Sequence, residues 1–76
     1  TKSWKLPNGD FHREDGPAVE HTNGFKEWFI NGKRHREDGP AVEFYDGDKV
    51  WFLNDIEYSK QDYKKKMRLI KLDKIL

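Results

Sequence analysis

Two copies of the string His-Arg-Glu-Asp-Gly-Pro-Ala-Val-Glu carry most of the chemically versatile side chains of this sequence. They span residues 12–20 and 35–43, so imidazole, guanidinium and carboxylate groups recur after 23 residues. Histidine beside carboxylates could bind a metal ion or transfer protons. Metal sites, however, are built from closely spaced ligands, often cysteines, and the chain has no cysteine. We therefore expect neither a metal site nor a cofactor.

Catalysis is not expected from these strings or from the remaining residues. Ser3 lies near the first residue and Ser59 fits a helix cap, so no serine stands out as a nucleophile with a base. A residue that serves packing recurs in every repeat, whereas a catalytic residue is needed only once. We predict that the chain is not an enzyme.

The repeat extends beyond the nine identical residues. Asn8-Gly9, Asn31-Gly32 and Asn54-Asp55 follow the same step, as do Asn23-Gly24 and Asp46-Gly47. Such pairs favour two-residue type I′ turns between antiparallel strands, because both residues reach positive φ at low cost. The sequence predicts strands over residues 18–22, 25–30, 33–35, 41–45, 49–53 and 56–58.

These strands predict a mainly β fold, an antiparallel hairpin meander of about two and a half units with a C-terminal α-helix. The units cover residues 1–17, 18–40 and 41–58, and the helix covers residues 59–76 of the same domain. Because strand side chains alternate between faces, the three tryptophans are expected to stack in register on one side of the sheet. The phenylalanine that follows each of the last two tryptophans should face the other side.

The repeated strings fall between the units, as loops. In each loop we expect the Asp to accept hydrogen bonds from backbone amides and the Gly to adopt positive φ. We expect the Arg to pair with an acid of the neighbouring unit. The residues predicted to face a partner are His12, Arg13, Glu14, His35, Arg36 and Glu37.

Charge is unevenly distributed, although the net charge is only +1. Residues 1–58 carry eight Lys and Arg against twelve Asp and Glu, whereas residues 59–76 carry seven against two. The repeats therefore hold a net charge of −4 and the C-terminal segment one of +5. An acidic surface favours a basic partner. We predict a small protein-binding module that engages a basic protein through its acidic repeats.

The C-terminal segment offers two alternatives. Ser59 and Asp62 resemble a capping box, and a stripe of Tyr63, Met67 and Ile70 should dock on the last strands. Exposed cations could instead bind phosphates of a nucleic acid or of an anionic membrane, and the residues for this basic site are Lys64, Lys65, Arg68 and Lys71. A separate apolar face could join two copies into a homodimer or a self-assembling array, through Leu69, Leu72 and Leu76.

The string Trp-Phe-Ile-Asn-Gly-Lys-Arg-His at residues 28–35, with its 23-residue period, resembles MORN-type hairpin repeats. The likeness covers residues 4–58, although Trp-Phe-Ile replaces the Tyr-x-Gly of the standard motif. The His-Arg-Glu-Asp-Gly-Pro-Ala string also resembles small repeat proteins of bacteriophages and large DNA viruses. The resemblance implies a protein-binding scaffold without catalytic residues, and a viral inhibitor or modulator of a host defence or nucleic-acid-handling protein.

The sequence has no run of about eighteen apolar residues, the length that a membrane span needs. Residues 1–9 also lack the apolar core of a secretion signal. We therefore expect a cytoplasmic protein without a transmembrane segment, located in the host cytoplasm if it is viral.

Overall fold

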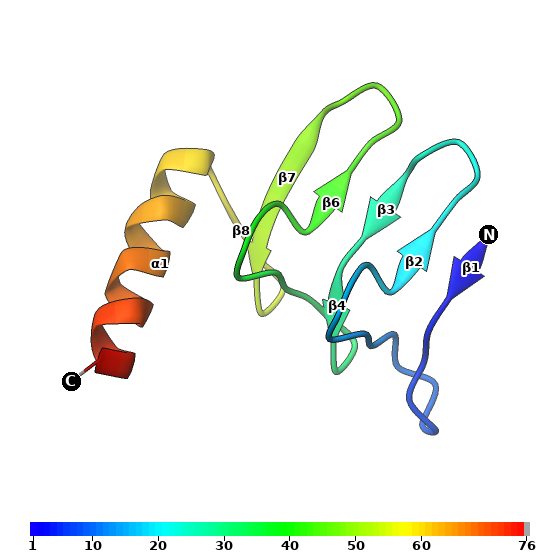
Figure 1. Cartoon of the computed structure of the whole chain (residues 1–76), viewed down its shortest axis with the longest axis horizontal. Helices are drawn as coiled ribbons and strands as arrows, with labels where there is room; N and C mark the ends of the chain where they lie inside the picture. Colours follow the sequence, from blue (N-terminus) through cyan, green and yellow to red (C-terminus); the bar gives the residue numbers. More distant parts are fainter. Residues whose placement is uncertain (76) are drawn as a thin grey trace.

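The computed structural model describes the backbone of residues 1–75 and the side chains of residues 1–72. Eight short strands are followed by one helix (Figure 1). The elements are β1 (Lys2–Ser3), β2 (Val19–Glu20), β3 (Lys26–Glu27), β4 (Phe29–Ile30), β5 (Lys33–Arg34), β6 (Val42–Glu43), β7 (Lys49–Leu53), β8 (Ile56–Tyr58) and α1 (Lys60–Ile75).

All strand pairs are antiparallel. Six strands form one sheet in the order β1-β2-β3-β6-β7-β8, and β4 and β5, which lie between β3 and β6 in the sequence, form a separate hairpin. The predicted hairpin meander with a C-terminal helix is thus confirmed. Strand β1 is an addition, because no strand was predicted before residue 18.

The predicted strand over residues 25–30 is divided at Trp28 into β3 and β4. The backbone N–H of Trp28 donates to the Ala41 carbonyl of the next unit, at 2.7 Å, so the chain turns away from its own hairpin at this point. The last unit has no following Pro-Ala-Val-Glu segment among the described residues. Its strand β7 accordingly continues unbroken from Lys49 to Leu53.

The turns are of two kinds. Asn31-Gly32 and Asn54-Asp55 have φ of 52° and 79°, and of 51° and 68°, as type I′ turns require. The type I′ prediction is wrong for Asn8-Gly9, Asn23-Gly24 and Asp46-Gly47, where only the glycine has positive φ. In these longer turns the Asn or Asp side chain instead accepts the amide two residues ahead, at 2.9 to 3.1 Å. A type I turn followed by a left-handed glycine results.

Two small apolar clusters stabilise the chain. The first consists of Ala18, Val19 and Phe29, with Phe11 packed against it at a ring distance of 5.2 Å. The second joins the helix to the end of the sheet and consists of Leu53, Tyr63 and Met67, with Trp51, Tyr58 and Ile70 around them. The predicted docking stripe of the helix is therefore confirmed.

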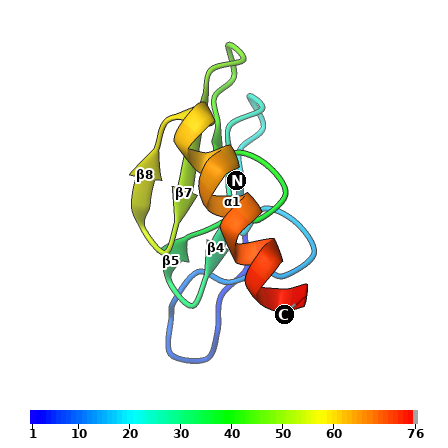
Figure 2. The same cartoon turned by 90° about the vertical axis from the view of Figure 1, so that its left-hand side faces the viewer.

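Helix α1 begins after Ser59, whose Oγ accepts the backbone N–H of Asp62 at 3.1 Å, as a cap should. Figure 2 shows the helix running along the end of the array, beside β7 and β8. Its outer face carries Leu69 and Leu72, both exposed. Leu76, the third residue of the predicted dimer face, lies outside the described residues.

Candidate functional site

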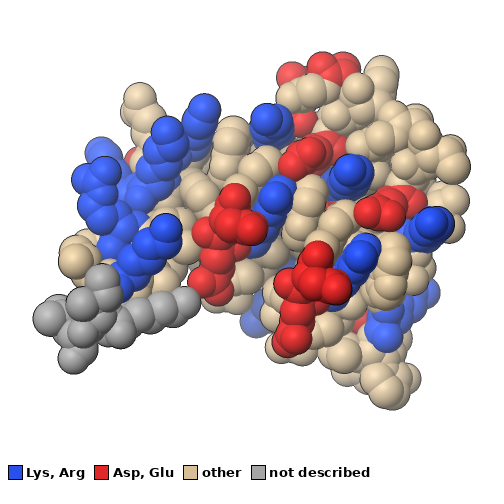
Figure 3. All heavy atoms as spheres, viewed as in Figure 1, with Lys and Arg blue, Asp and Glu red and all other residues tan. Residues whose placement is uncertain are grey.

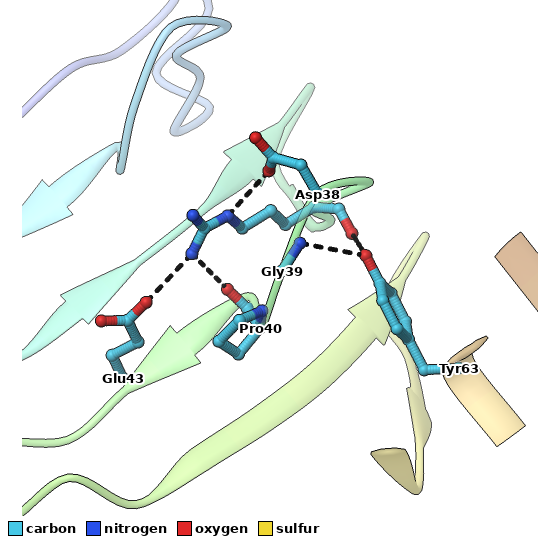
Figure 4. Close-up of polar contacts among 6 residues, drawn as sticks. Asp38, Gly39, Pro40, Glu43 and Tyr63 are labelled. Carbon is cyan, nitrogen blue, oxygen red and sulfur yellow. Dashed lines mark hydrogen bonds and ion pairs between the residues drawn. The ribbon is translucent and has the colours of Figure 1, made fainter. Parts of the chain in front are cut away.

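Each His-Arg-Glu-Asp-Gly-Pro loop is built around its arginine. In the second loop the guanidinium of Arg36 lies over the ring of Trp28, 3.9 Å from its centroid. Its Nε donates to Asp38 at 2.9 Å, and its Nη1 donates to the Pro40 carbonyl and to Glu43, each at 3.0 Å (Figure 4). One side chain therefore fixes its own loop, a tryptophan below it and an acid of the next unit.

The first loop repeats these contacts. Arg13 lies 3.9 Å from the ring centroid of Trp4, and it donates to Asp15 at 3.0 Å and to the Pro17 carbonyl at 3.1 Å. Its ion pair with Glu20 is looser, at 3.8 Å. The predicted pairing of arginine with an acid of the next unit is confirmed. The predicted stack of tryptophan rings is wrong, because an arginine covers the ring of Trp4 and another covers the ring of Trp28.

The glycines and aspartates of the loops serve the arginine. Gly16 and Gly39 do not have the predicted positive φ. A Cβ at Gly39 would lie 2.9 Å from Cζ of Arg36, and one at Gly16 would lie 3.1 Å from Cζ of Arg13. Glycine therefore leaves space for the guanidinium, which a Cβ would push aside. The described hydrogen bonds of the loop aspartates come from arginine Nε, not from backbone amides as predicted.

The loop histidines hold the turn of the neighbouring unit. The backbone N–H of Asn31 donates to Nδ1 of His12 at 2.9 Å, and that of Asn54 donates to Nδ1 of His35 at 3.1 Å. We therefore assign the proton of each neutral ring to Nε2, which faces the glutamate two residues ahead, at 3.7 Å and 3.1 Å. A fixed offset of 19 residues between histidine and asparagine in both units is the signal in the sequence.

The side chains that project from the loops are acids. Glu14, Asp15, Glu37 and Asp38 are between 48% and 87% exposed, whereas the histidines and arginines beside them are only 16% to 25% exposed. Among the residues predicted to face a partner, the structure thus places the two glutamates outward and uses the histidines and arginines internally. The two aspartates, for which the sequence predicts hydrogen bonds within the loop, project as far.

A groove of about 550 Å³ separates the two loops. Trp28 and Ile30 contribute apolar surface to it, and the acids of both loops line it. Figure 3 shows the two acidic groups side by side, each next to a cation. Sequence reasoning missed this groove, because it depends on how two loops 23 residues apart are oriented.

The sheet itself carries a row of alternating charges. Cross-strand partners place lysine and glutamate alternately on five strands, and Figure 3 shows cations and carboxylates alternating across this face. This charge row consists of Lys2, Glu20, Lys26, Glu43 and Lys49. Opposite charges facing each other stabilise the sheet. The excess of acid in the repeats therefore lies in the loops and turns.

Tyr63 takes the place of a third loop arginine. Its ring lies 6.4 Å from that of Trp51, and its hydroxyl donates to the Arg36 carbonyl at 2.6 Å. The same hydroxyl accepts the N–H of Gly39 at 3.3 Å (Figure 4). Burial raises the pKa of Tyr63, so the phenol is neutral at physiological pH and can donate.

Beside this tyrosine, a second groove of about 510 Å³ separates the second loop from α1. Three of the four residues of the predicted basic site line it, namely Lys64, Arg68 and Lys71. The facing wall carries Glu37 and Asp38. Lys65 lies elsewhere, because each residue turns the helix by about 100°.

Among the described residues, no three His, Asp or Glu side chains are grouped closely enough to hold a metal ion. The described helix does not have the length and apolar character needed to cross a membrane. No family model matches the chain, and comparisons with curated proteins and with solved structures gave no match.

Proposed function

We propose that this chain is a small, non-enzymatic protein-binding module whose two acid-tipped loops engage a basic partner. The observation that supports it is the exposure of Glu14, Asp15, Glu37 and Asp38 on loops that their own arginines hold rigid. A surface that is already ordered loses little conformational entropy when it binds. The resemblance to viral repeat proteins would make the partner a host protein, which stays a prediction.

The groove between the loops suggests what the partner presents. Four loop acids line it together with the loop arginines and His35, and Trp28 and Ile30 supply apolar contacts. Tryptophan and arginine are enriched at strong binding positions in protein interfaces. A segment with one apolar side chain between arginines or lysines would satisfy both features.

The test uses a fluorescein-labelled peptide of this design, Arg-Arg-Leu-Arg-Arg, and measures its anisotropy at low salt. Glu14→Gln with Glu37→Gln should weaken binding about tenfold, because two exposed ion pairs are lost. The control is Asp48→Asn with Glu57→Gln, which removes the same charge from exposed residues outside the groove. Raised salt should weaken binding of the wild type. Equal loss in both variants, or no loss in either, would contradict the proposal.

A second candidate function is phosphate binding by the helix. Lys64, Arg68 and Lys71 share one side of α1 and line a groove with Trp51, an arrangement that suits a nucleic acid or an anionic membrane surface. The two loop acids on the facing wall oppose it. Labelled DNA and RNA, or anionic vesicles, at low salt provide the test. Binding that is lost in Lys64→Gln with Arg68→Gln would support this function over the first, and no binding would exclude it.

A further inference from the structure

The six-stranded sheet has an unfilled position beside β7. Strand β3 is paired on both sides, with β2 and with β6. Lys49 and Val50 occupy the same place in the last unit, yet they pair only with β6. Strand β8 pairs with β7 farther along, from Trp51 onward. Within the described chain, therefore, no strand pairs with Lys49 and Val50 in the way that β6 pairs with β3.

Figure 1 agrees with this pairing: the first part of β7 has β6 on one side and no strand on the other. Helix α1 does not replace the missing strand. Its buried residues Tyr63 and Met67 pack on Leu53, at the far end of β7. The backbone edge at Lys49–Val50 is thus available for a strand from another molecule.

The chain itself indicates the sequence that fits. Beside β3, strand β6 places Val42 opposite Glu27 and Glu43 opposite Lys26. One unit later the same register would place a valine opposite Val50 and a glutamate opposite Lys49. An apolar pair and an opposite-charge pair would form side by side.

The charge row supports the same conclusion. It alternates lysine with glutamate and ends in lysine at both edges of the array, at Lys2 and at Lys49. A strand added beside β7 would continue this alternation if it placed an acid opposite Lys49. Because lysine at an edge repels another lysine, the row also discourages pairing between two copies of this sheet.

We propose that the edge of β7 at Lys49–Val50 binds an extended segment of a partner protein by β-strand addition, and that this segment carries a small residue, a β-branched residue and an acid in succession. In such complexes main-chain hydrogen bonds provide affinity and alternate side chains provide specificity. A second copy is not the occupant, since β2 and β6, its own Ala-Val-Glu strands, are paired on both sides. Its edge strand β1 would bring Lys2 against Lys49.

The experiment is a titration of the full chain, labelled with ¹⁵N, with the blocked peptide Pro-Ala-Val-Glu-Phe-Tyr, the sequence of residues 40–45. At millimolar peptide, saturable amide shifts are expected at Lys49 and Val50. The same peptide with an N-methylated glutamate should give none, because the bond from the Trp28 N–H to the Ala41 carbonyl makes residue 43, and not residue 42, the ladder donor toward the neighbouring strand. Pro-Ala-Val-Lys-Phe-Tyr should bind roughly two- to fivefold more weakly, from the loss of one cross-strand charge pair.

Charge reversal in the protein makes the test specific. In Lys49→Glu the preference should invert, so that the lysine peptide binds more tightly than the glutamate peptide. Lys33→Glu makes the same charge change in β5 and should keep the original order. If Lys49→Glu does not fold by circular dichroism, Lys49→Gln should bind both peptides equally. Absence of shifts at Lys49 and Val50, or an unchanged peptide order in the Lys49 variants, would overturn the proposal.

The result does not depend on the proposed function. The edge of β7 is separate from Glu14 and Glu37, so the loop variant should bind the glutamate peptide as the wild type does. If the chain binds the glutamate peptide but not the arginine peptide, the proposal of β-strand addition is therefore supported and the proposal that the acidic loops bind a basic partner is contradicted.

Discussion

Tyr63→Phe tests how the helix is attached to the repeats. The substitution keeps the ring that packs on Trp51, Leu53 and Met67 and removes only the hydroxyl. That hydroxyl donates to the carbonyl of residue 36 at 2.6 Å and accepts the N–H of residue 39 at 3.3 Å. It is thus a direct polar connection between α1 and the second loop.

The expected loss follows from these two contacts. A hydrogen bond contributes about 1 kcal/mol net to stability, and we assign that value to the short bond. The longer bond contributes about half as much, so the free energy of unfolding should fall by about 1.5 kcal/mol. In a domain of this size the melting temperature should fall by about 6 to 12 °C.

Urea unfolding followed by tryptophan fluorescence and by helical circular dichroism would measure this loss. Tyr58→Phe is the matched control, because Tyr58 packs on the same cluster and none of the described hydrogen bonds involves its hydroxyl. It should change the free energy of unfolding by less than about 0.5 kcal/mol, the usual range for such a substitution. If both variants had the stability of the wild type, the hydroxyl of Tyr63 would not hold the helix in place.

The pH dependence provides a second measurement on Tyr63. Burial raises its pKa in the folded state, so its contribution is complete below the usual tyrosine pKa of about 10. The contribution is lost as the pH rises through the raised folded-state value, since the unfolded chain ionises first. The stability difference between wild type and Tyr63→Phe should therefore shrink above about pH 10. A difference that stays constant would contradict this assignment.

Two further substitutions test the loop and the core. Gly39→Ala should lower the free energy of unfolding by about 1 to 2 kcal/mol in a urea titration, because its Cβ would displace the guanidinium of Arg36. Unchanged stability would mean that the arginine can move freely. Leu53→Ala should cost about 2 to 5 kcal/mol, because Leu53 is buried beneath the helix, and circular dichroism should lose the helical signal first. Retained helicity at unchanged stability would argue against this docking.

The fold was largely predictable because its signals are local. The turn residues and the cap at Ser59 act within a few positions and predicted the hairpins and the helix, although three of the five turns are not of the predicted type. The division of the strand at Trp28 was not predictable in this way. It depends on a hydrogen bond to Ala41, which becomes a neighbour only when the next unit packs.

The candidate site was only partly predictable for the same reason. Two loops with acids, arginines and histidines could be located from sequence, but not which side chains they expose. His12 accepts a hydrogen bond from the backbone of Asn31 in the next unit, and Arg36 packs on the ring of Trp28. Glycine in these loops was assigned to backbone freedom, whereas Gly39 provides space for a side chain. A repeated residue thus indicates a repeated contact without identifying the contact.

At the C-terminal end of the repeats, helix α1 lies next to the unpaired edge of β7. Counting one period from the second loop, residues 58–63 stand where a third His-Arg-Glu-Asp-Gly-Pro would come, and they read Tyr-Ser-Lys-Gln-Asp-Tyr. They begin a helix, and Tyr63 makes a tilted ring contact with Trp51, where the earlier rings are covered by an arginine. The helix therefore completes the loop side of the last unit but supplies no strand. Because the strand side ends at Lys49 and Val50, this edge lacks, within the described chain, the pairing that β6 gives to β3 in the unit before it.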